Sequence, residues 1–387
     1  MSVDPIDLLG VGTLFSEEER LIADTVRRFV EDRVRPTIGR WFAEGTFPRE
    51  LVSELGALGV FGMHLTGYGC AGATATAYGI ACMELEAADS GLRSLVSVQG
   101  SLAMTAIHRF GSEEQKQRWL PAMAAGDAIG CFGLTEPDFG SDPAGMRTTA
   151  RRDGDNWVLN GAKMWITNGG IADVAVVWAR AEEGIKGFLV PRGTKGFTTR
   201  DIENKLSLRA SVTSELILTD CVLRAEAVLA GGRGLRAPLS CLNEARYGIL
   251  WGAVGAARDC YVTAVDYAKT RIQFGRPIAG FQLTQAKLVD MALELEKAYL
   301  TAQHIGRLKD AGRCDPAHVS FGKLNNVRAA LTIAREARTI LAASGVTTEY
   351  SVLRHANNLE SVLTYEGTSE IHTLVLGEAI TGIGSYR

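Results

Sequence analysis

Apolar residues recur at helical spacing near the start of the chain. They are Leu21, Ile22, Val26, Phe29 and Val30. This period of three to four predicts an amphipathic helix. Ser16 and Glu19 precede it as a capping-box pair, because the Ser16 hydroxyl can accept from the Glu19 N–H while the Glu19 side chain reaches back. Pro36 is predicted to limit this helix, since proline lacks the N–H that a helix interior needs.

Three more helical patterns follow before the composition changes. They cover residues 47–60, 74–91 and 112–126. Segment 74–91 is rich in alanine, which allows close packing against a neighbouring helix. Segment 112–126 opens with a second capping box, from Ser112 to Gln115. The first third of the chain is therefore predicted to be helical.

The pattern becomes strand-like near Cys131. Short apolar or alternating runs bounded by Gly, Pro, Asp and Asn cover residues 172–180, 186–192 and 214–223. Segment 156–168 carries strand residues on both sides of Asn160-Gly161, a dipeptide typical of a hairpin turn. At least four short strands at such spacing predict a small β-barrel or sandwich.

The helical period returns at about Leu239. Segment 281–312 is long and amphipathic, and segment 321–345 predicts another long helix stopped at Gly345. The expected fold class is mainly α with a central β domain. Its predicted parts are an N-terminal helical domain (1–130), a middle β domain (131–238) and a C-terminal helical bundle (239–387).

Composition narrows the classes of function. The 387 residues are 46% hydrophobic and 22% charged, with a formal net charge of -3, which disfavours nucleic acid and anionic membranes as partners. Seven scattered Cys without a CxxC pair, and six His without HxxxH spacing, favour free thiols in a reducing compartment and disfavour a metal site. The N-terminus carries acids and lacks the basic region of a secretory signal, so we expect a cytoplasmic protein.

Three segments carry candidate chemistry, each with a structural alternative. The Gly-rich stretch Cys131–Asp142 suits a heterocycle or phosphate, or is an ordinary interdomain turn. Trp165–Asn168 offers an indole beside a hydroxyl, or a strand end with a core Trp. Arg271–Gln282 holds two Arg suited to a pyrophosphate, or is a surface loop. No G-x-G-x-x-G follows a predicted strand, and the sequence has no P-loop, so neither a Rossmann dinucleotide site nor an NTPase is supported.

Taken together, the segments GLTEPDFGSD, WITN, RIQFGRPI and YEGTSEI resemble the acyl-CoA dehydrogenase family in order and separation. The resemblance covers nearly the whole chain. It implies an N-terminal helical domain, a central β-barrel and a C-terminal four-helix bundle. It also implies a homotetramer of paired dimers that contains FAD, removes hydrogens from Cα and Cβ of a CoA thioester, and passes electrons to electron-transferring flavoprotein.

The resemblance also implies the cofactor-binding residues. Those lining FAD within one subunit would be Phe132, Leu134, Thr135, Gly140 and Ser141, with Trp165, Ile166 and Thr167 at the isoalloxazine and Thr368 and Glu370 at the nucleotide. Arg271 and Gln282 would reach FAD across a subunit boundary, Arg271 towards its pyrophosphate, and Phe274 would be a further cofactor-binding residue. Many relatives carry Gly-Gly where this chain has Ala342-Ala343, which is expected to weaken FAD retention.

The substrate residues follow from the same resemblance. Glu366 would be the base that takes the α-proton, and its N–H would bind the thioester carbonyl. Ser141 would also lie near the substrate, and Asn243 and Arg246 would be polar positions of the CoA and acyl-chain helix. Tyr365 would border the acyl pocket, and Gly367 would leave space for substrate.

Segment 84–101, with the stretches CLNEARYGILWG and AITGIGSYR, is similar to the glutaryl-CoA dehydrogenases of this family. This similarity implies that Arg93 and Ser94 receive the distal carboxylate of glutaryl-CoA, with Glu86 near Arg93. The structural alternative is an Arg93 that only pairs with Glu86 or Asp89. The implied products are crotonyl-CoA and carbon dioxide. A non-decarboxylating enzyme, or one for another dicarboxylyl or short-chain acyl-CoA, stays open.

Overall fold

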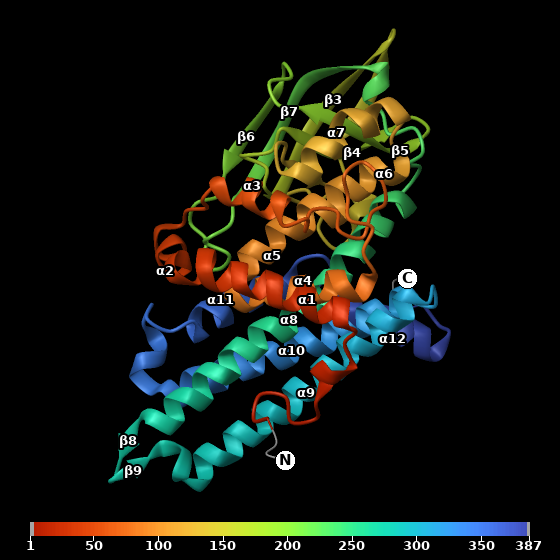
Figure 1. Cartoon of the computed structure of the whole chain (residues 1–387). Coiled ribbons are helices and arrows are strands. Elements are labelled where there is room, and N and C mark those ends of the chain that lie inside the picture. Colours follow the sequence, from red (N-terminus) through yellow and green to blue (C-terminus); the bar gives the residue numbers. More distant parts are fainter. Residues whose placement is uncertain (1–3, 385–387) are drawn as a thin grey trace.

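The computed structural model describes residues 4–384. It shows helices from both ends of the chain and a sheet formed by the middle of the sequence, at one end of the molecule (Figure 1). The predicted class, mainly α with a central β domain, is confirmed. Residues 1–3 of the acidic N-terminus and residues 385–387 of AITGIGSYR lie outside the described residues. Within 4–384, no helix is both long and apolar enough to cross a bilayer.

The N-terminal region is helical, as expected. Its helices are α1 (Glu17–Phe29), α2 (Arg35–Glu44), α3 (Glu50–Ala57), α4 (Ala75–Ala88), α5 (Ser90–Ser97), α6 (Thr105–Phe110) and α7 (Glu113–Ala125), with π-helical segments η2 (Val30–Val34) and η3 (Val98–Met104). Both capping boxes, at Ser16 and Ser112, are confirmed by their reciprocal hydrogen bonds.

The prediction that Pro36 limits the first helix is wrong. The helical backbone runs from α1 through η2 into α2, and Pro36 lies in the first turn of α2. A proline is tolerated there because it directly follows the π-helical segment, where the Arg35 N–H donates to the Val30 carbonyl and the regular α-helical hydrogen-bond pattern is interrupted.

The middle region is a seven-stranded sheet. Its strands are β1 (Gly130–Gly133), β2 (Thr149–Asp153), β3 (Asn156–Thr167), β4 (Val174–Ala181), β5 (Gly184–Pro191), β6 (Phe197–Asp201) and β7 (Thr213–Arg224). They pair in the order β1-β4-β2-β3-β7-β6, with β5 on β4. The short strand β1 is anchored by η3, where the Gln99 amide oxygen accepts from the Gly130 N–H at 2.7 Å.

The predicted hairpin turn at Asn160-Gly161 is also wrong. Strand β3 continues through both residues and pairs with β7 along its length. Gly161 absorbs a bulge at φ 145°, and a Cβ there would lie 2.7 Å from the Thr148 Cα. The glycine therefore serves a close approach of two strands, not a reversal of the chain.

The C-terminal region is a helical bundle. Its helices are α8 (Arg236–Thr270), α9 (Gln282–Asp310), α10 (Pro316–Leu341), α11 (Val352–Thr364) and α12 (Ser369–Thr381). A small hairpin of β8 (Ile272–Gln273) and β9 (Arg276–Pro277) joins α8 to α9. Helix α10 ends at Leu341 and not at Gly345, because Ala342–Val346 form a 3-10 turn and Ala342 has φ 51°.

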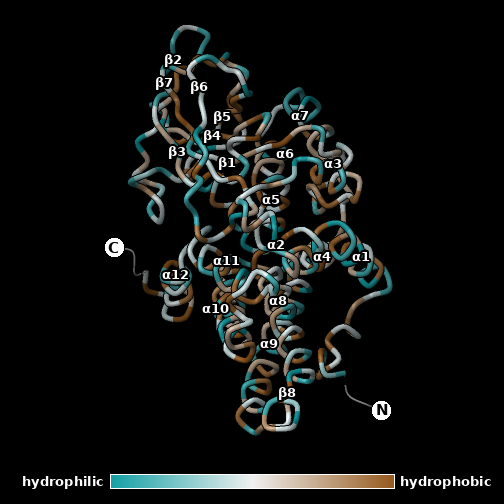
Figure 2. Tube along the Cα trace, turned by 90° about the vertical axis from the view of Figure 1, so that its left-hand side faces the viewer, coloured by the Kyte–Doolittle hydropathy of each residue, from teal (hydrophilic) through white to brown (hydrophobic). Residues whose placement is uncertain are grey.

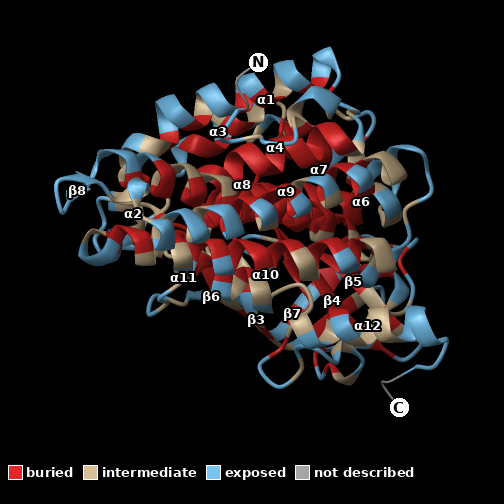
Figure 3. Ribbon diagram, turned by 90° about the horizontal axis from the view of Figure 1, so that it is seen from below, coloured by how far each residue is buried: buried red, intermediate tan, exposed pale blue. Residues whose placement is uncertain are grey.

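Helix α4 of the N-terminal region packs against the long helix α8 of the C-terminal region. Helices α4 and α8 are buried along most of their length in the interior of the molecule (Figure 3). They approach closely at glycines, since a Cβ on Gly255 would overlap the Met83 carbonyl. The sheet and helices α6 and α7 form one end of the molecule, while α8–α10 extend to the β8–β9 hairpin at the other (Figure 2). Segment η3 packs against both β1 and α8, and so links the two ends.

Candidate active site

Glu366 lies on a short loop between α11 and α12. The backbone of this loop is unusual, with φ 53° at Glu366 and φ 100° at Gly367. A Cβ on Gly367 would lie 2.9 Å from the His372 Nε2 and 3.2 Å from an Arg246 guanidinium nitrogen. The space beside Gly367 is therefore filled by these two side chains of the protein.

Two cations, the half-buried Arg246 and the buried Lys323, hold the carbonyl groups of this loop. The Arg246 Nε donates to the Glu366 carbonyl at 2.6 Å. The Lys323 ammonium, on α10, donates to the Gly367 carbonyl at 2.6 Å and also to the Tyr365 carbonyl. Because Lys323 is only 1% exposed, these bonds are shielded from water. Three successive carbonyls are thus bound by side chains from two helices of the bundle.

The surroundings of Glu366 make it a stronger base than an exposed carboxylate. Burial raises its pKa, while the charges of Arg93, Lys323 and Arg246 act in the opposite direction. Its Oε2 is buried and has no hydrogen-bond partner within residues 4–384. Burial lowers the pKa of Lys323 to about 7 and that of His372 to about 3, so His372 is neutral at physiological pH.

Arg93 is buried beside this loop. Its side chain is 0% exposed, and its Nε donates to the Glu86 carboxylate at 2.6 Å. One terminal nitrogen donates to the Tyr365 hydroxyl, whereas the other, Nη1, has no partner in the described part of the chain. Gly252 of α8 makes the pair possible, because a Cβ there would overlap the Glu86 carboxylate.

The structure distinguishes between the two carboxylates considered as partners of Arg93. Glu86 pairs with it, as described above. Asp89 instead caps α5 through the Gly91 N–H at 2.7 Å, and accepts from Arg354 at 3.1 Å and Asn358 at 2.8 Å. The contacts with Glu86 and Tyr365 leave one terminal nitrogen of Arg93 for a further acceptor.

The other predicted substrate residues fall on the same helices. Ser94 follows Arg93 on α5 and is buried. Asn243 and Arg246 lie one turn apart on α8, and the buried Asn243 Oδ1 has no partner among the described residues. The structure therefore brings Glu86, Arg93 and Arg246 to the Glu366 loop.

The predicted flavin residues form a second group on the sheet. Phe132 and Leu134 are buried on and after β1, and Gly140 and Ser141 are exposed on the following loop. A bulge in β3 holds Trp165 at φ 65°, with its side chain 60% exposed. The Met164 N–H donates to the Thr135 carbonyl at 2.9 Å and joins the two segments. An exposed indole held rigidly beside a hydroxyl fits a planar ring, so these residues fit FAD.

A buried ion pair beneath this group was not foreseen from the sequence. The Lys163 ammonium donates to the Glu136 carboxylate at 2.8 Å and to the Leu134 carbonyl at 3.1 Å. Glu136 also accepts from the N–H groups of Arg147 and Thr148. Burial lowers the pKa of Lys163 to about 8. The pair fixes the loop that carries Thr135 and Ser141.

The remaining predicted cofactor residues lie in two other places. Thr368 is the N-cap of α12 and accepts from the Ile371 N–H at 3.3 Å, with Glu370 in the first turn. Arg271, Phe274 and Gln282 lie at the β8–β9 hairpin, at the opposite end of the molecule from β3 (Figure 1). Phe274 is 93% exposed. One chain alone therefore does not bring the hairpin to the other cofactor residues.

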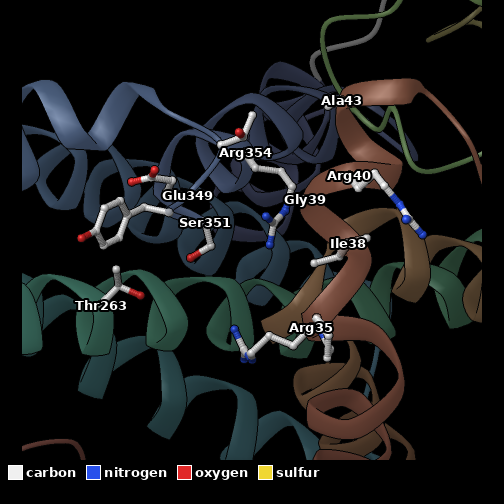
Figure 4. Close-up of a pocket in the computed structure, with 12 residues that line it drawn as sticks. Arg35, Ile38, Gly39, Arg40, Ala43, Thr263, Glu349, Ser351 and Arg354 are labelled. Carbon is white, nitrogen blue, oxygen red and sulfur yellow. The ribbon is translucent and has the colours of Figure 1, made fainter.

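An open pocket of about 530 Å³ lies elsewhere, between α2 and the segment before α11. Arg35, Arg40 and Arg354 line it together with Ser351 and Thr263 (Figure 4). Two of these arginines are already paired, Arg35 with Asp259 at 2.7 Å and Arg354 with Asp89. None of the predicted site residues lines this pocket.

Lys323 and His372 are the substrate-side residues that sequence reasoning missed. Lys323 lies four residues from both Val319 and Val327, on the buried stripe of α10. A lysine on the apolar stripe of a helix was the available signal, because an ammonium is buried only when it has partners. His372 carries no comparable signal in the sequence.

Comparison with known proteins agrees with this geometry. Three family models match in succession: the acyl-CoA dehydrogenase N-terminal domain at residues 16–127, the middle domain at 131–221 and the C-terminal domain at 232–381. The short-chain specific acyl-CoA dehydrogenase of human mitochondria is 38% identical over 378 residues, which cover 96% of this chain and 91% of that protein.

Solved structures give the same result. A glutaryl-CoA dehydrogenase from Mycobacterium smegmatis is 64% identical with a TM-score of 0.98, and 100% of each chain is covered. A glutaryl-CoA dehydrogenase of the same organism in complex with FADH2 is 61% identical, with a TM-score of 0.99 and 100% of each chain covered. A glutaryl-CoA dehydrogenase solved with glutaryl-CoA is 33% identical, with a TM-score of 0.92 over 95% of this chain and 96% of that one. The chain belongs to the acyl-CoA dehydrogenase family, whose members are FAD-dependent oxidoreductases that act on a CH–CH bond.

Proposed function

We propose that the chain oxidises glutaryl-CoA at its α,β-bond. The observation that carries this proposal is the buried Arg93, whose Nη1 has no partner within residues 4–384 and which contacts Tyr365 next to Glu366. A simple fatty acyl chain needs only an apolar pocket. Arg93 is already paired with Glu86, but its unpartnered terminal nitrogen is a buried charged donor that a substrate carboxylate can satisfy. The glutaryl-CoA dehydrogenases at 61% and 64% identity support the same substrate.

In this proposal Glu366 removes the α-proton of the thioester. Its burial raises the proton affinity that the reaction requires. The N–H of Glu366 donates to the thioester carbonyl and so stabilises the enolate that develops there. Bound FAD supplies the acceptor for the hydride that leaves Cβ. The predicted FAD residues on β1, β3 and α12 would hold it within one subunit.

Arg93 and Ser94 hold the distal carboxylate in this proposal. The Glu86 carboxylate accepts from the Arg93 Nε, and one terminal nitrogen, Nη1, stays without a partner among residues 4–384. A guanidinium suits this task because its N–H groups match the two oxygens of a carboxylate. Asn243 and the pocket wall at Tyr365 would contact the acyl-CoA.

Loss of carbon dioxide is the proposed second step. Once the α,β-double bond has formed, the bond from Cγ to the carboxylate can break, and its electron pair enters a dienolate conjugated with the thioester. Return of a proton to Cγ from protonated Glu366 then gives crotonyl-CoA. If this step does not occur, the product is glutaconyl-CoA.

The proposed partners follow from the surface. Apolar Leu283, Val289 and Leu293 are exposed on α9, and Phe274 at the hairpin is 93% exposed. Such a surface favours burial between subunits. We propose a homotetramer in which Arg271, Phe274 and Gln282 reach the FAD of a neighbouring subunit.

Electron-transferring flavoprotein is the proposed electron acceptor, and the cytoplasm is the proposed location.

Product analysis tests the proposed reaction. The purified flavoprotein is incubated with glutaryl-CoA and an artificial electron acceptor, with a second sample that lacks the acceptor as control. We expect crotonyl-CoA and an equal amount of carbon dioxide. Glutaconyl-CoA alone would exclude decarboxylation but retain the dehydrogenase. If butyryl-CoA is oxidised and glutaryl-CoA is not, the chain is a short-chain enzyme, as in the human relative's name.

A further inference from the structure

Lys323 is a buried charge that the reaction described above does not use. It projects from the middle of α10, and its ammonium reaches the loop of the catalytic carboxylate. We propose that Lys323 is a positioning residue for the Glu366 base: it fixes the loop through the carbonyls on either side of Glu366 and sets the proton affinity of that carboxylate. This inference rests on the proposed role of Glu366.

The backbone of the loop explains why a cation is needed. Two successive residues with positive φ, Glu366 and Gly367, turn the carbonyls of this loop towards the bundle. There the Tyr365 and Gly367 carbonyls accept from Lys323, while Arg246 binds the carbonyl between them. Positive φ is unfavourable at a non-glycine residue, so Glu366 keeps this conformation only if surrounding contacts enforce it.

Lys323 acts on Glu366 through its charge as well as through its hydrogen bonds to the loop. Glu366 is faced by Arg93 from α5, Arg246 from α8 and Lys323 from α10, with neutral His372 on α12 and Glu86 on α4 behind Arg93. A nearby cation stabilises the carboxylate form. Loss of the Lys323 charge would therefore raise the pKa of Glu366. Burial also lowers the pKa of Lys323 itself, to about 7.

A purely structural role predicts a different outcome. A buried lysine that only satisfied two carbonyls would affect stability, but not the pH dependence of the chemical step. The chain offers a matched control in Lys205, which donates to the Leu208 carbonyl at 2.9 Å and the Ser211 carbonyl at 2.7 Å. Burial lowers the pKa of Lys205 to about 8, and it binds none of the carbonyls at 365–367.

The test compares K323Q, K323M and K205M with the wild-type holoenzyme. Glutamine retains N–H donors for the two carbonyls without the charge, whereas methionine removes both. The readouts are the rate of flavin reduction at saturating substrate across pH, the bound FAD and the melting temperature. Substrate is whichever acyl-CoA reduces the wild-type flavin, so a wrong substrate assignment does not affect this test.

We expect the acidic limb of the rate profile to move to higher pH in both Lys323 variants, with FAD still bound. The rate should fall by about 100-fold in K323M, because small misplacements of a base cost that much. K205M should lower the melting temperature without moving the limb. If K323M does not fold, the position of the acidic limb in K323Q alone tests the proposal. A limb at the wild-type position in K323Q would overturn the proposal, as would an equal shift in K205M.

Discussion

Glu366 combines two properties that are hard to obtain together in one carboxylate. Its burial raises its pKa, while Arg93, Lys323 and Arg246 keep the charged form accessible. Its backbone is held in a positive-φ conformation by hydrogen bonds to carbonyl groups and not by regular secondary structure. The residue therefore depends on side chains from three helices of two regions of the chain.

Replacement of Glu366 by Gln tests the base directly. Glutamine is nearly isosteric but cannot accept the α-proton, so flavin reduction by substrate should fall by at least 10³-fold, at the upper part of the range for general base catalysis. FAD content should stay unchanged, because the predicted FAD residues on β1 and β3 are unaltered. Anaerobic stopped-flow absorbance measures the rate. Normal turnover of E366Q would refute the assignment.

The Glu86–Arg93 pair makes a prediction that separates stability from specificity. R93Q leaves Glu86 buried without its partner, which should cost about 3–5 kcal/mol of unfolding free energy. The double variant E86Q/R93Q removes both charges and should regain much of that stability. Glutaryl-CoA oxidation should still be reduced about 10- to 100-fold, because the charged hydrogen bond to substrate is lost.

Urea unfolding and flavin reduction with glutaryl-CoA measure the two effects. Pentanoyl-CoA, which has the same chain length without the carboxylate, serves as the control substrate. Its rate should not fall in the double variant. Equal losses with both substrates would mean that Arg93 supports the pocket without recognising a carboxylate.

Motifs identified some of these residues and could not identify others. Glu366, Arg93 and Trp165 stand in short contiguous segments, so resemblance to a family was sufficient to single them out. Lys323 contacts the Glu366 loop from a helix more than 40 residues away, as the sequence separation of 42 to Tyr365 shows. No local sequence pattern indicates a contact of that kind. The position of Lys323 on the apolar stripe of α10 indicates only that its ammonium has buried partners.

At the scale of elements, the close packing of α4 against α8 determines the space for the Glu86–Arg93 ion pair. Gly252 on α8 faces the Glu86 carboxylate, and a Cβ at this position would overlap it and lie 3.2 Å from the Arg93 Nε. The absence of a side chain at one helical position therefore leaves the volume in which the ion pair forms. Glycine in a helix interior ordinarily lowers stability by about 1 kcal/mol relative to alanine.

Helix propensity alone predicts that G252A stabilises α8, but we expect G252A to destabilise the protein. We expect a lower melting temperature, because overpacking a tight interior costs about 1–3 kcal/mol, and a raised KM for glutaryl-CoA because Arg93 is displaced. G377A in α12 is the matched control, since a Cβ there meets nothing within 4 Å among the described residues. G377A should be neutral or slightly stabilising. Equal effects of the two variants would contradict the packing argument.

Periodicity predicted the helices well and the interruptions poorly. The predictions of helices after Ser16 and Ser112, and of a long helix from residue 281, were correct. Amphipathic spacing and capping boxes are local signals, so the sequence alone shows them. Pro36, Asn160-Gly161 and Gly345 were misread. In the structure Pro36 lies in the first turn of a helix and Gly161 in a bulge, and the helix before Gly345 ends at Leu341. Each depends on neighbouring elements that the local sequence does not specify.

For the whole molecule, buried acids connect the regions of the chain. Glu84 on α4 accepts from Arg27 on α1 and from Arg258 on α8. Glu244 on α8 pairs with Arg109 on α6 and Lys309 on α9. Burial alone would raise the pKa of each acid, but the paired cations outweigh it and lower both values to about 2. The N-terminal helices are thus tied to the bundle by ionised carboxylates.

These pairs predict the direction of acid sensitivity. A carboxylate whose pKa is lowered by folding contributes its full stabilisation above its ordinary value of 4.5, and the contribution is lost as pH falls towards about 2. The difference in unfolding free energy between wild type and E84Q should therefore shrink from pH 6 to pH 3. Chemical denaturation at both pH values measures it. A difference that is constant or grows at low pH would contradict the assignment of Glu84.

The central claim is that this flavoprotein oxidises an acyl-CoA whose distal carboxylate is bound by Arg93. The most direct measurement is the anaerobic rate of flavin bleaching by glutaryl-CoA compared with pentanoyl-CoA in the wild-type holoenzyme. We predict rapid bleaching by glutaryl-CoA and bleaching at least about 10-fold slower by pentanoyl-CoA, as expected for loss of one charged hydrogen bond. Equal rates, or faster bleaching by pentanoyl-CoA, would contradict the claim.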